Sequence, residues 1–328
     1  MELPEPRGTL SAELTRALRD GGAPLAGVGP DDDEDLQLGL WILYELHYRG
    51  FDGVDEGREW DPELVAVRGR LETHFEAELR SACGPIVALA DDSESVPDQL
   101  EAITAHDSSV SLPLYLQREA SADQYLEFLV QRTLYHLKES DPHAWLLPRL
   151  EGPPKVALAE LLYDEFGGGR PERLHSRLFA DALVDCGLDA QYGVYVDRVP
   201  GYTLAVNNAM SMFGLHRRLR GAAMGHLAAF EMTSSLPARR ILQGAQRLDL
   251  GGAVQHYFSE HVEADAVHEH IAARGICVPL VETEPELGDD VLFGAAACVH
   301  LDAVAAERMI DAWSRGSALL PDQGRAVA

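Results

Sequence analysis

Two histidines and an aspartate share one stripe of a segment in the C-terminal half of the chain. His261, Asp265 and His268 are spaced i, i+4 and i+7 in the run Y-F-S-E-H-V-E-A-D-A-V-H. On an α-helix these positions lie along one face, with about 10 Å between the first and the last. A buried aspartate needs a partner, and a metal ion supplies one. The pattern favours a metal-binding helix face. The alternative is a solvated polar face, because glutamates flank the stripe.

A run of glycines divides a second informative segment. We expect one helix to end at residues 167–169 and another to begin at Pro171. Glu165 and His175 then lie on either side of the break, where side chains ten residues apart can converge. Glu172 is a competing candidate, because it precedes His175 with the E-x-x-H spacing of di-iron carboxylate bundles. The glycines alone are also typical of a plain turn between helices.

Two further glutamates are candidates for the same chemistry. Glu231 is the only acid between Asp197 and Asp249, and apolar residues flank it. Such an acid is either buried with a partner or turned outward. Glu139 ends a predicted helix, where a surface position would be the default.

Together these residues offer oxygen and imidazole donors without thiolate, a combination that suits iron or manganese. Four carboxylates would balance the charge of two divalent cations, which favours a dinuclear site. The candidate metal ligands are Glu139, Glu165, His175, Glu231, His261, Asp265 and His268.

The overall composition is typical of a globular protein, with 328 residues, 46% hydrophobic and 25% charged. Acids outnumber lysine and arginine by 54 to 27, so the net charge is −27 and the surface repels nucleic acid and anionic membranes. None of the 4 cysteines forms a C-x-x-C pair, which fits a reducing cytosol. The chain shows no signal peptide and no long apolar span, so we expect a cytoplasmic protein.

The elements that must position these residues are helices, since the hydrophobic period is helical and no period of two is evident. Acids at 31–35 precede an apolar run and are expected to cap a helix rather than form a calcium loop. The sequence therefore predicts an all-α bundle of about seven core helices with an N-terminal helical extension. The predicted helices cover residues 11–18, 62–82, 121–139, 155–166, 171–186, 201–215, 217–233, 237–246, 252–274 and 290–313.

The ordered set of seven candidates resembles the ligand set of the haem-oxygenase-like di-iron oxidases and oxygenases, also called iron-containing redox enzymes. The successive spacings of 26, 10, 56, 30, 4 and 3 residues are similar to those of the N-oxygenating branch. The segments D-E-F-G-G-G, H-x-x-L-F and H-x3-D-x2-H are the specific parts, and the resemblance covers roughly residues 115 to 275.

This resemblance implies a haem-oxygenase-like fold and two iron ions that alternate between Fe(II) and Fe(III), with O2 as co-substrate. It divides the chain into an N-terminal helical extension at 1–110, a di-iron domain at 111–320 and a disordered tail at 321–328. Within the site, Glu139 and Glu231 would bridge or terminate the irons, each histidine would hold one iron, and Asp265 would shift between binding modes.

The family implies oxidation of a small molecule, commonly an amino acid, an amine or a fatty acid, in natural product biosynthesis. In the family that this chain resembles, an additional carboxylate at the position of Glu165 is typical of the N-oxygenases. If Glu165 is a turn residue instead, C–H oxidation, desaturation or C–C cleavage becomes the better hypothesis. We favour Glu165 over Glu172. The implied partners are the small substrate, an external electron donor and a second copy of the chain in a homodimer, with no nucleic acid and no membrane.

Several residues near the ligands are candidates for supporting roles. Arg132 is the nearest arginine that could bind a substrate carboxylate. Others could hydrogen-bond the ligands or simply belong to the core, namely Tyr135, Tyr163, Asp164 and Tyr257.

Three other classes of protein remain open on the sequence alone. A ferritin-like protein would use Glu172-x-x-His175 and Asp265-x-x-His268. A haem-oxygenase-like or thiaminase-like protein would have the fold without a di-iron site. A helical interaction protein would carry these acids and histidines on its surface.

Overall fold

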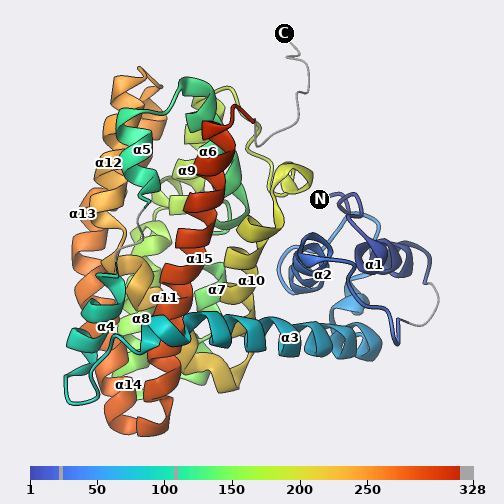
Figure 1. The fold of residues 1–328 in the computed structure, drawn as a ribbon, viewed down its shortest axis with the longest axis horizontal. Helices are drawn as coiled ribbons and strands as arrows, with labels where there is room; N and C mark the ends of the chain where they lie inside the picture. The colour runs from blue at the N-terminus through green and yellow to red at the C-terminus, as the bar shows by residue number, and fades with distance from the viewer. Residues whose placement is uncertain (22–24, 107–109, 318–328) are drawn as a thin grey trace.

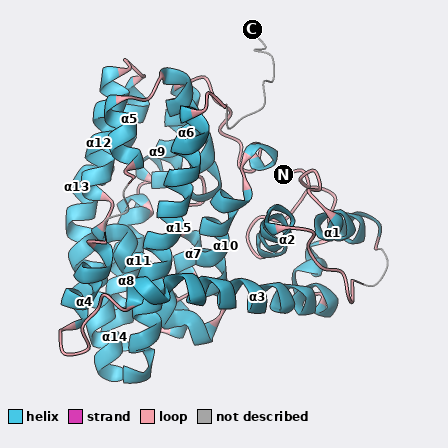
Figure 2. Cartoon of the chain, viewed as in Figure 1, coloured by secondary structure: helices cyan, strands magenta, loops and turns pink. Residues whose placement is uncertain are grey.

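Helices form all the regular structure in the described part of this protein. The computed structural model describes residues 1–21, 25–106 and 110–317, without the side chains of residues 263–267. Within these ranges no strand occurs (Figure 2), which confirms the predicted all-α class. Among the described helices, none is both long enough and apolar enough to cross a membrane.

The larger part of the molecule is a bundle formed by the C-terminal two thirds of the chain. In Figure 1, α12 and α13 lie along one edge, and α15 runs next to α11. The principal bundle helices are α6 (Ala122–His136), α8 (Gly152–Glu165), α9 (His175–Asp185), α10 (Gly201–Leu215), α11 (Arg220–Met232), α12 (Ser235–Arg247), α13 (Gly252–His270) and α15 (Gly288–Ser314).

The N-terminal helices pack against this bundle. Helix α2 contacts α10, while α3 crosses the lower half of the bundle, above α14 (Val278–Thr283), and contacts α15 (Figure 1). Residues from both parts belong to one hydrophobic core, for example Trp41 and Phe213. The domain boundary predicted at residue 110 stays a prediction. The helices that precede α6 are α1 (Thr9–Asp20), α2 (Asp33–Glu45), α3 (Pro62–Val87), α4 (Val96–Thr104) and α5 (Leu112–Arg118).

The acidic run at 31–35 caps helices, as the sequence predicts. The Asp32 side chain accepts a hydrogen bond from the backbone nitrogen of Asp35 at 3.0 Å, which caps α2. Asp35 is fully buried and accepts from the backbone nitrogens of Leu10 and Ser11, each at 2.9 Å. One acid therefore starts α2, and another fixes the beginning of α1 against it.

A buried ion pair also joins the N-terminal helices to the bundle. Lys138, in the turn after α6, places its Nζ 3.0 Å from Glu45 Oε2 at the end of α2. The Tyr192 hydroxyl donates to the same oxygen at 2.7 Å. All three side chains are buried, so this contact is shielded from water.

The helix predicted for 121–139 ends earlier, at His136. Glu139 therefore stands in a turn, and Ser140 after it adopts the left-handed region with φ 67°. This conformation is uncommon for a residue other than glycine, and it reverses the chain directly after Glu139. The turn, rather than a helix end, sets the direction of the Glu139 side chain.

The helix predicted from Pro171 also begins later. Pro171–Arg173 is a single 3₁₀ turn, η4, and extended backbone at Leu174 separates it from α9, which starts at His175. The backbone of residues 173 and 174 passes so close to Gly167 that a Cβ there would lie 2.7 Å from it. The glycine break is therefore required by a close approach of two chain segments.

The helix predicted for 252–274 also changes character before its end. Helix α13 stops at His270, and Ile271–Cys277 continues it as a π-helix, η7. Elsewhere the predicted helices are confirmed with small shifts at their ends. Helix α3 is longer than predicted, because it continues through Pro85 to Val87.

Glycines bring the backbones of α11 and α15 into direct contact. A Cβ added to Gly225 would overlap the carbonyl oxygen of Val291, and one added to Gly294 would overlap that of Ala222. Only glycine permits this separation of the two helices. Because α11 also carries Glu231, the contact helps to set the depth of that side chain in the bundle.

We expect Gly225→Ala and Gly294→Ala each to lower the free energy of unfolding by about 1–3 kcal/mol, because the added methyl forces packed backbones apart. Urea unfolding measures this change. Gly69→Ala in α3 is the matched control, since a Cβ there meets nothing within 4 Å. That change should stabilise by up to about 1 kcal/mol through helix propensity. Equal effects at all three positions would contradict the packing argument.

Candidate metal centre

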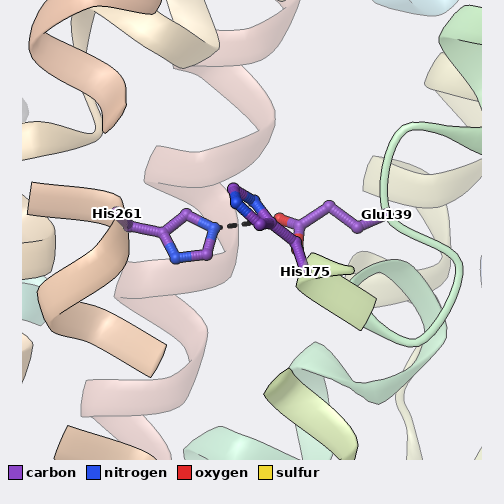
Figure 3. A group of neighbouring side chains, drawn as sticks. All are labelled: Glu139, His175 and His261. Carbon is purple, nitrogen blue, oxygen red and sulfur yellow. Dashed lines mark ion pairs between the residues drawn. The ribbon is translucent and has the colours of Figure 1, made fainter. Parts of the chain in front are cut away.

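Six side chains from five parts of the bundle form two adjoining clusters. Glu139, His175 and His261 make the first cluster, and Glu165, Glu231 and His268 make the second cluster. In each cluster one donor atom per residue lies within 4.8 Å of the other two. Figure 3 shows the first cluster, with His261 from α13, His175 from α9 and Glu139 from the turn after α6 pointing toward one another. All but His261, which is half-buried, are buried.

Glu165 lies between the two clusters. Its Oε2 is 3.2 Å from His175 Nδ1, and its Oε1 is 3.3 Å from His268 Nδ1. The hydroxyl of Ser140 donates to Oε2 at 3.2 Å. One carboxylate therefore contacts a histidine of each cluster, which is the position that a bridging ligand would need.

The first cluster is oriented by hydrogen bonds from neighbouring side chains. His261 Nδ1 donates to the Tyr257 carbonyl at 2.9 Å, which leaves Nε2 facing Glu139 Oε1 at 3.6 Å. The Tyr257 hydroxyl donates to Glu139 Oε2 at 3.2 Å, and His136 Nδ1 lies 3.0 Å from Oε1. Contacts of this kind fix the direction of ligating groups. Sequence reasoning named Tyr257 but missed His136, whose only signal is its place one helical turn before Glu139.

A hydrogen bond with a neighbouring side chain also orients the second cluster. His268 Nε2 donates to Asp164 Oδ2 at 2.8 Å, so Nδ1 faces Glu165 and lies 3.6 Å from Glu231 Oε2. His268 is only 1% exposed, although Asp164 itself reaches the surface. Asp164 thus occupies the supporting position considered from the sequence.

Tyr163 and Tyr135, the two other tyrosines named from the sequence, do not hydrogen-bond to the candidate ligands in the described structure. Tyr163 is exposed, and its hydroxyl donates to the Gly168 carbonyl at 2.8 Å within the glycine turn. Tyr135 is buried, and its ring packs edge-on against His136 and Phe230. Tyr135 matches the alternative that it belongs to the core, whereas the exposed Tyr163 neither belongs to the core nor contacts a candidate ligand in the described structure.

Six of the seven predicted ligands are thus brought together. The exception is Asp265, whose backbone lies in α13 one turn after His261 and whose side chain falls outside the described part of the structure. Glu172, the competitor of Glu165, is exposed on η4 and belongs to neither cluster. The geometry therefore favours Glu165.

The electrostatics follow from burying acids beside imidazoles. Burial opposes ionisation of Glu139, but His136 and His261 outweigh it and hold the pKa of Glu139 well below its usual range. Burial lowers the pKa of His268, yet Glu231 and Glu165 outweigh this and raise it to about 9. Without a metal, His268 is therefore protonated near neutral pH. The donor set of carboxylates and imidazoles fits divalent iron, which would take the place of such protons.

We expect metal binding to release protons, because His268 must lose its proton to act as a ligand. At about pH 7, Mn(II) binding should release close to one proton from the second cluster, and affinity should rise as pH approaches 9. Above that pH the release should fade, since His268 is already neutral. Calorimetry in buffers of different ionisation enthalpy measures the release, and His268→Gln should remove the part that His268 contributes. Burial lowers the pKa of His175, but Glu165 outweighs this and raises it, so the first cluster adds a release of its own that the variant keeps. Release that is independent of pH would contradict this assignment.

A cavity of about 450 Å³ reaches the first cluster. Glu139 and His261 line it, together with Arg132 and the aromatic walls Phe128 and Phe258. A substrate-sized molecule would fit this volume, and a mostly apolar wall with a few polar groups is typical of ligand sites. Arg132, named from the sequence, thus lies in the same cavity as two of the metal-ligand candidates.

Comparisons with known proteins agree with this arrangement. The sequence model of a family described as iron-containing redox enzymes matches residues 126–303, a range that contains all seven predicted ligands. A nitrosourea synthase from Streptomyces achromogenes subsp. streptozoticus is 28% identical over 166 residues, which is 50% of this chain and 34% of that protein. The match thus spans about a third of the length of this curated relative.

Proposed function

This chain belongs to the family of iron-containing redox enzymes, and we propose that it is an O2-dependent non-haem di-iron enzyme that oxidises a small amino-acid-like or amine substrate. Family membership makes it an oxidoreductase that uses iron. The further details, which are two irons, O2 and the substrate class, are the proposal.

The observation that carries the proposal is the position of Glu165 between two buried carboxylate–imidazole clusters. Two clusters that share a carboxylate offer two adjacent metal positions, whereas a single structural ion needs only one. The first cluster also opens onto a cavity large enough for a substrate.

The protein's own residues would hold and orient the irons. Iron, when bound, supplies the redox chemistry that reduces O2. Glu139 is held by His136 and Tyr257, His268 is held by Asp164, and Ser140 holds Glu165. The aromatic wall formed by Phe128 and Phe258 limits water at the first cluster. Insertion of one oxygen atom from O2 into a substrate consumes two further electrons, so an external donor is part of the proposal.

Nitrogen is the favoured atom for oxidation. A nitrosourea contains an oxidised nitrogen, and the match to a nitrosourea synthase therefore supports N-oxygenation in the biosynthesis of a natural product. C–H oxidation is the second candidate reaction for the same site. The link between the additional carboxylate of Glu165 and N-oxygenation comes from the family resemblance alone.

We expect Glu165→Gln to lower anaerobic Fe(II) binding from two ions per chain to one or fewer, since the change removes a charge that contacts both clusters. Glu172→Gln is the matched control, because Glu172 is exposed and seven residues away, and it should bind two. Iron is counted with a colorimetric chelator after gel filtration. Iron lost from the Glu172 variant alone would instead favour the ferritin-like arrangement.

The reaction with O2 is a separate test. Protein loaded anaerobically with two equivalents of Fe(II) should give a transient visible absorption band on stopped-flow mixing with O2. The His268→Ala variant lacks one imidazole of the second cluster and should give no band. Fe(II) that stays reduced in air, with and without candidate amines and amino acids, would overturn the proposed activity.

A further inference from the structure

A second, smaller cavity adjoins the one that reaches the first cluster. It has a volume of about 40 Å³ and shares the lining residues Leu112, Arg132, Phe230 and Asp302 with the larger cavity. We call it the polar recess, because Gln131, Asn207 and His226 also line it. Its volume is enough for one small polar group or about one water molecule.

Buried polar atoms of the recess lack hydrogen-bond partners among the described residues. They are Gln131 Nε2, Asn207 Oδ1 and both ring nitrogens of His226. These side chains are at most 5% exposed. Thr203 fixes the second amide atom of both Gln131 and Asn207. Its hydroxyl donates to Gln131 Oε1 at 3.0 Å, and its backbone carbonyl accepts from Asn207 Nδ2 at 3.0 Å. Buried donors and acceptors held in this way need a partner, which a bound molecule can supply.

Arg132 and Asp302, two residues of opposite charge, lie where the two cavities adjoin. Within the described part of the chain, neither the Arg132 guanidinium nor the Asp302 carboxylate makes a hydrogen bond or an ion pair. The Arg132 Cζ lies 5.4 Å from the centre of the Phe128 ring, while Asp302 projects from α15. Both line both cavities. Both side chains are partly buried, and burial raises the pKa of the Asp302 carboxyl while Arg132 lowers it, so the two groups act on each other without a hydrogen bond between them. A ligand that carries both complementary charges would pair directly with each of them.

We propose that Arg132 and Asp302 bind the carboxylate and the ammonium of a zwitterionic substrate, an amino acid held by its head group where the polar recess adjoins the larger cavity. The rest of the substrate then lies in the larger cavity, with its far end at Glu139 and His261. This inference rests on the proposed function, which it deepens by assigning the substrate class and the end that is oxidised.

The chemistry of the two groups supports each assignment. A guanidinium binds a carboxylate through two parallel hydrogen bonds. An ammonium offers three donors, and Asp302 together with Asn207 Oδ1 offers acceptors on the same recess. A simple carboxylic acid would pair only with Arg132, and a simple amine would pair only with Asp302. The aromatic walls of the larger cavity suit the less polar middle of a side chain.

Binding measurements on the metal-free protein test the inference without relying on turnover. The 20 common L-amino acids are screened by thermal shift and calorimetry. The best binder is then compared with its decarboxylated amine and its desamino acid. We expect the amino acid to bind about 10-fold or more tightly than either analogue. No binding by any of the 20, or equal binding by one analogue, would overturn the inference.

Two variants test which residue binds the substrate ammonium and which binds the substrate carboxylate. Asp302→Asn should remove the preference for the amino acid over its desamino acid, and Arg132→Gln should remove the preference over the amine. Arg240→Gln is the matched control, because Arg240 lines the larger cavity but not the recess, and it should keep both preferences. Reversed or unchanged preferences would overturn the assignment. If the variants fail to fold, the analogue comparison on the unaltered protein still decides.

Iron binding separates this inference from the proposed function. A chain that binds two Fe(II) ions and reacts with O2 but fails the head-group comparison would refute only the recognition by Arg132 and Asp302. A chain that passes the comparison but binds no iron would refute the di-iron proposal and leave the zwitterion site in place.

Discussion

Three glutamates buried in two adjoining clusters are the constraint on which the rest of this structure depends. Glu139, Glu165 and Glu231 repel one another in a medium that screens charge poorly. Each is therefore placed against an imidazole, and in the absence of metal one of these, His268, holds its proton to about pH 9. Bound protons or bound metal cations can each offset this repulsion, and the proposed di-iron site would use metal cations.

The positions of these acids depend on backbone features rather than on helix propensity alone. Glu231 lies on a helix whose separation from α15 is set by a contact between glycine and carbonyl oxygen. Glu139 lies in a turn that ends in the left-handed Ser140, and Ser140 in turn donates to Glu165. Small residues and one strained residue thus place the three charges, and the large side chains around them exclude water.

Much of this arrangement could be predicted from the sequence. The helical period gave the all-α class, and the spacing of acids and histidines named six side chains that do converge. The end of α6 was missed because Lys138 and Glu139 suit a helix, whereas the structure ends the helix at His136 and continues in a turn to the left-handed Ser140. His136 and the polar recess were missed for another reason. Their roles depend on which side chains from distant helices meet, and no local pattern encodes that.

The buried pair of Lys138 and Glu45 has a consequence for the independence of the bundle. The range shared with the family begins at residue 126, yet the counter-charge of Lys138 comes from α2, far upstream. If only the Glu45 carboxylate were neutralised, the Lys138 ammonium would stay buried without its counter-charge, at a cost of about 3–5 kcal/mol. The range shared with the family therefore does not contain the partners of all its buried charges. A graft of the candidate metal-ligand segments, together with Lys138, onto another scaffold would have to include an acid in place of Glu45.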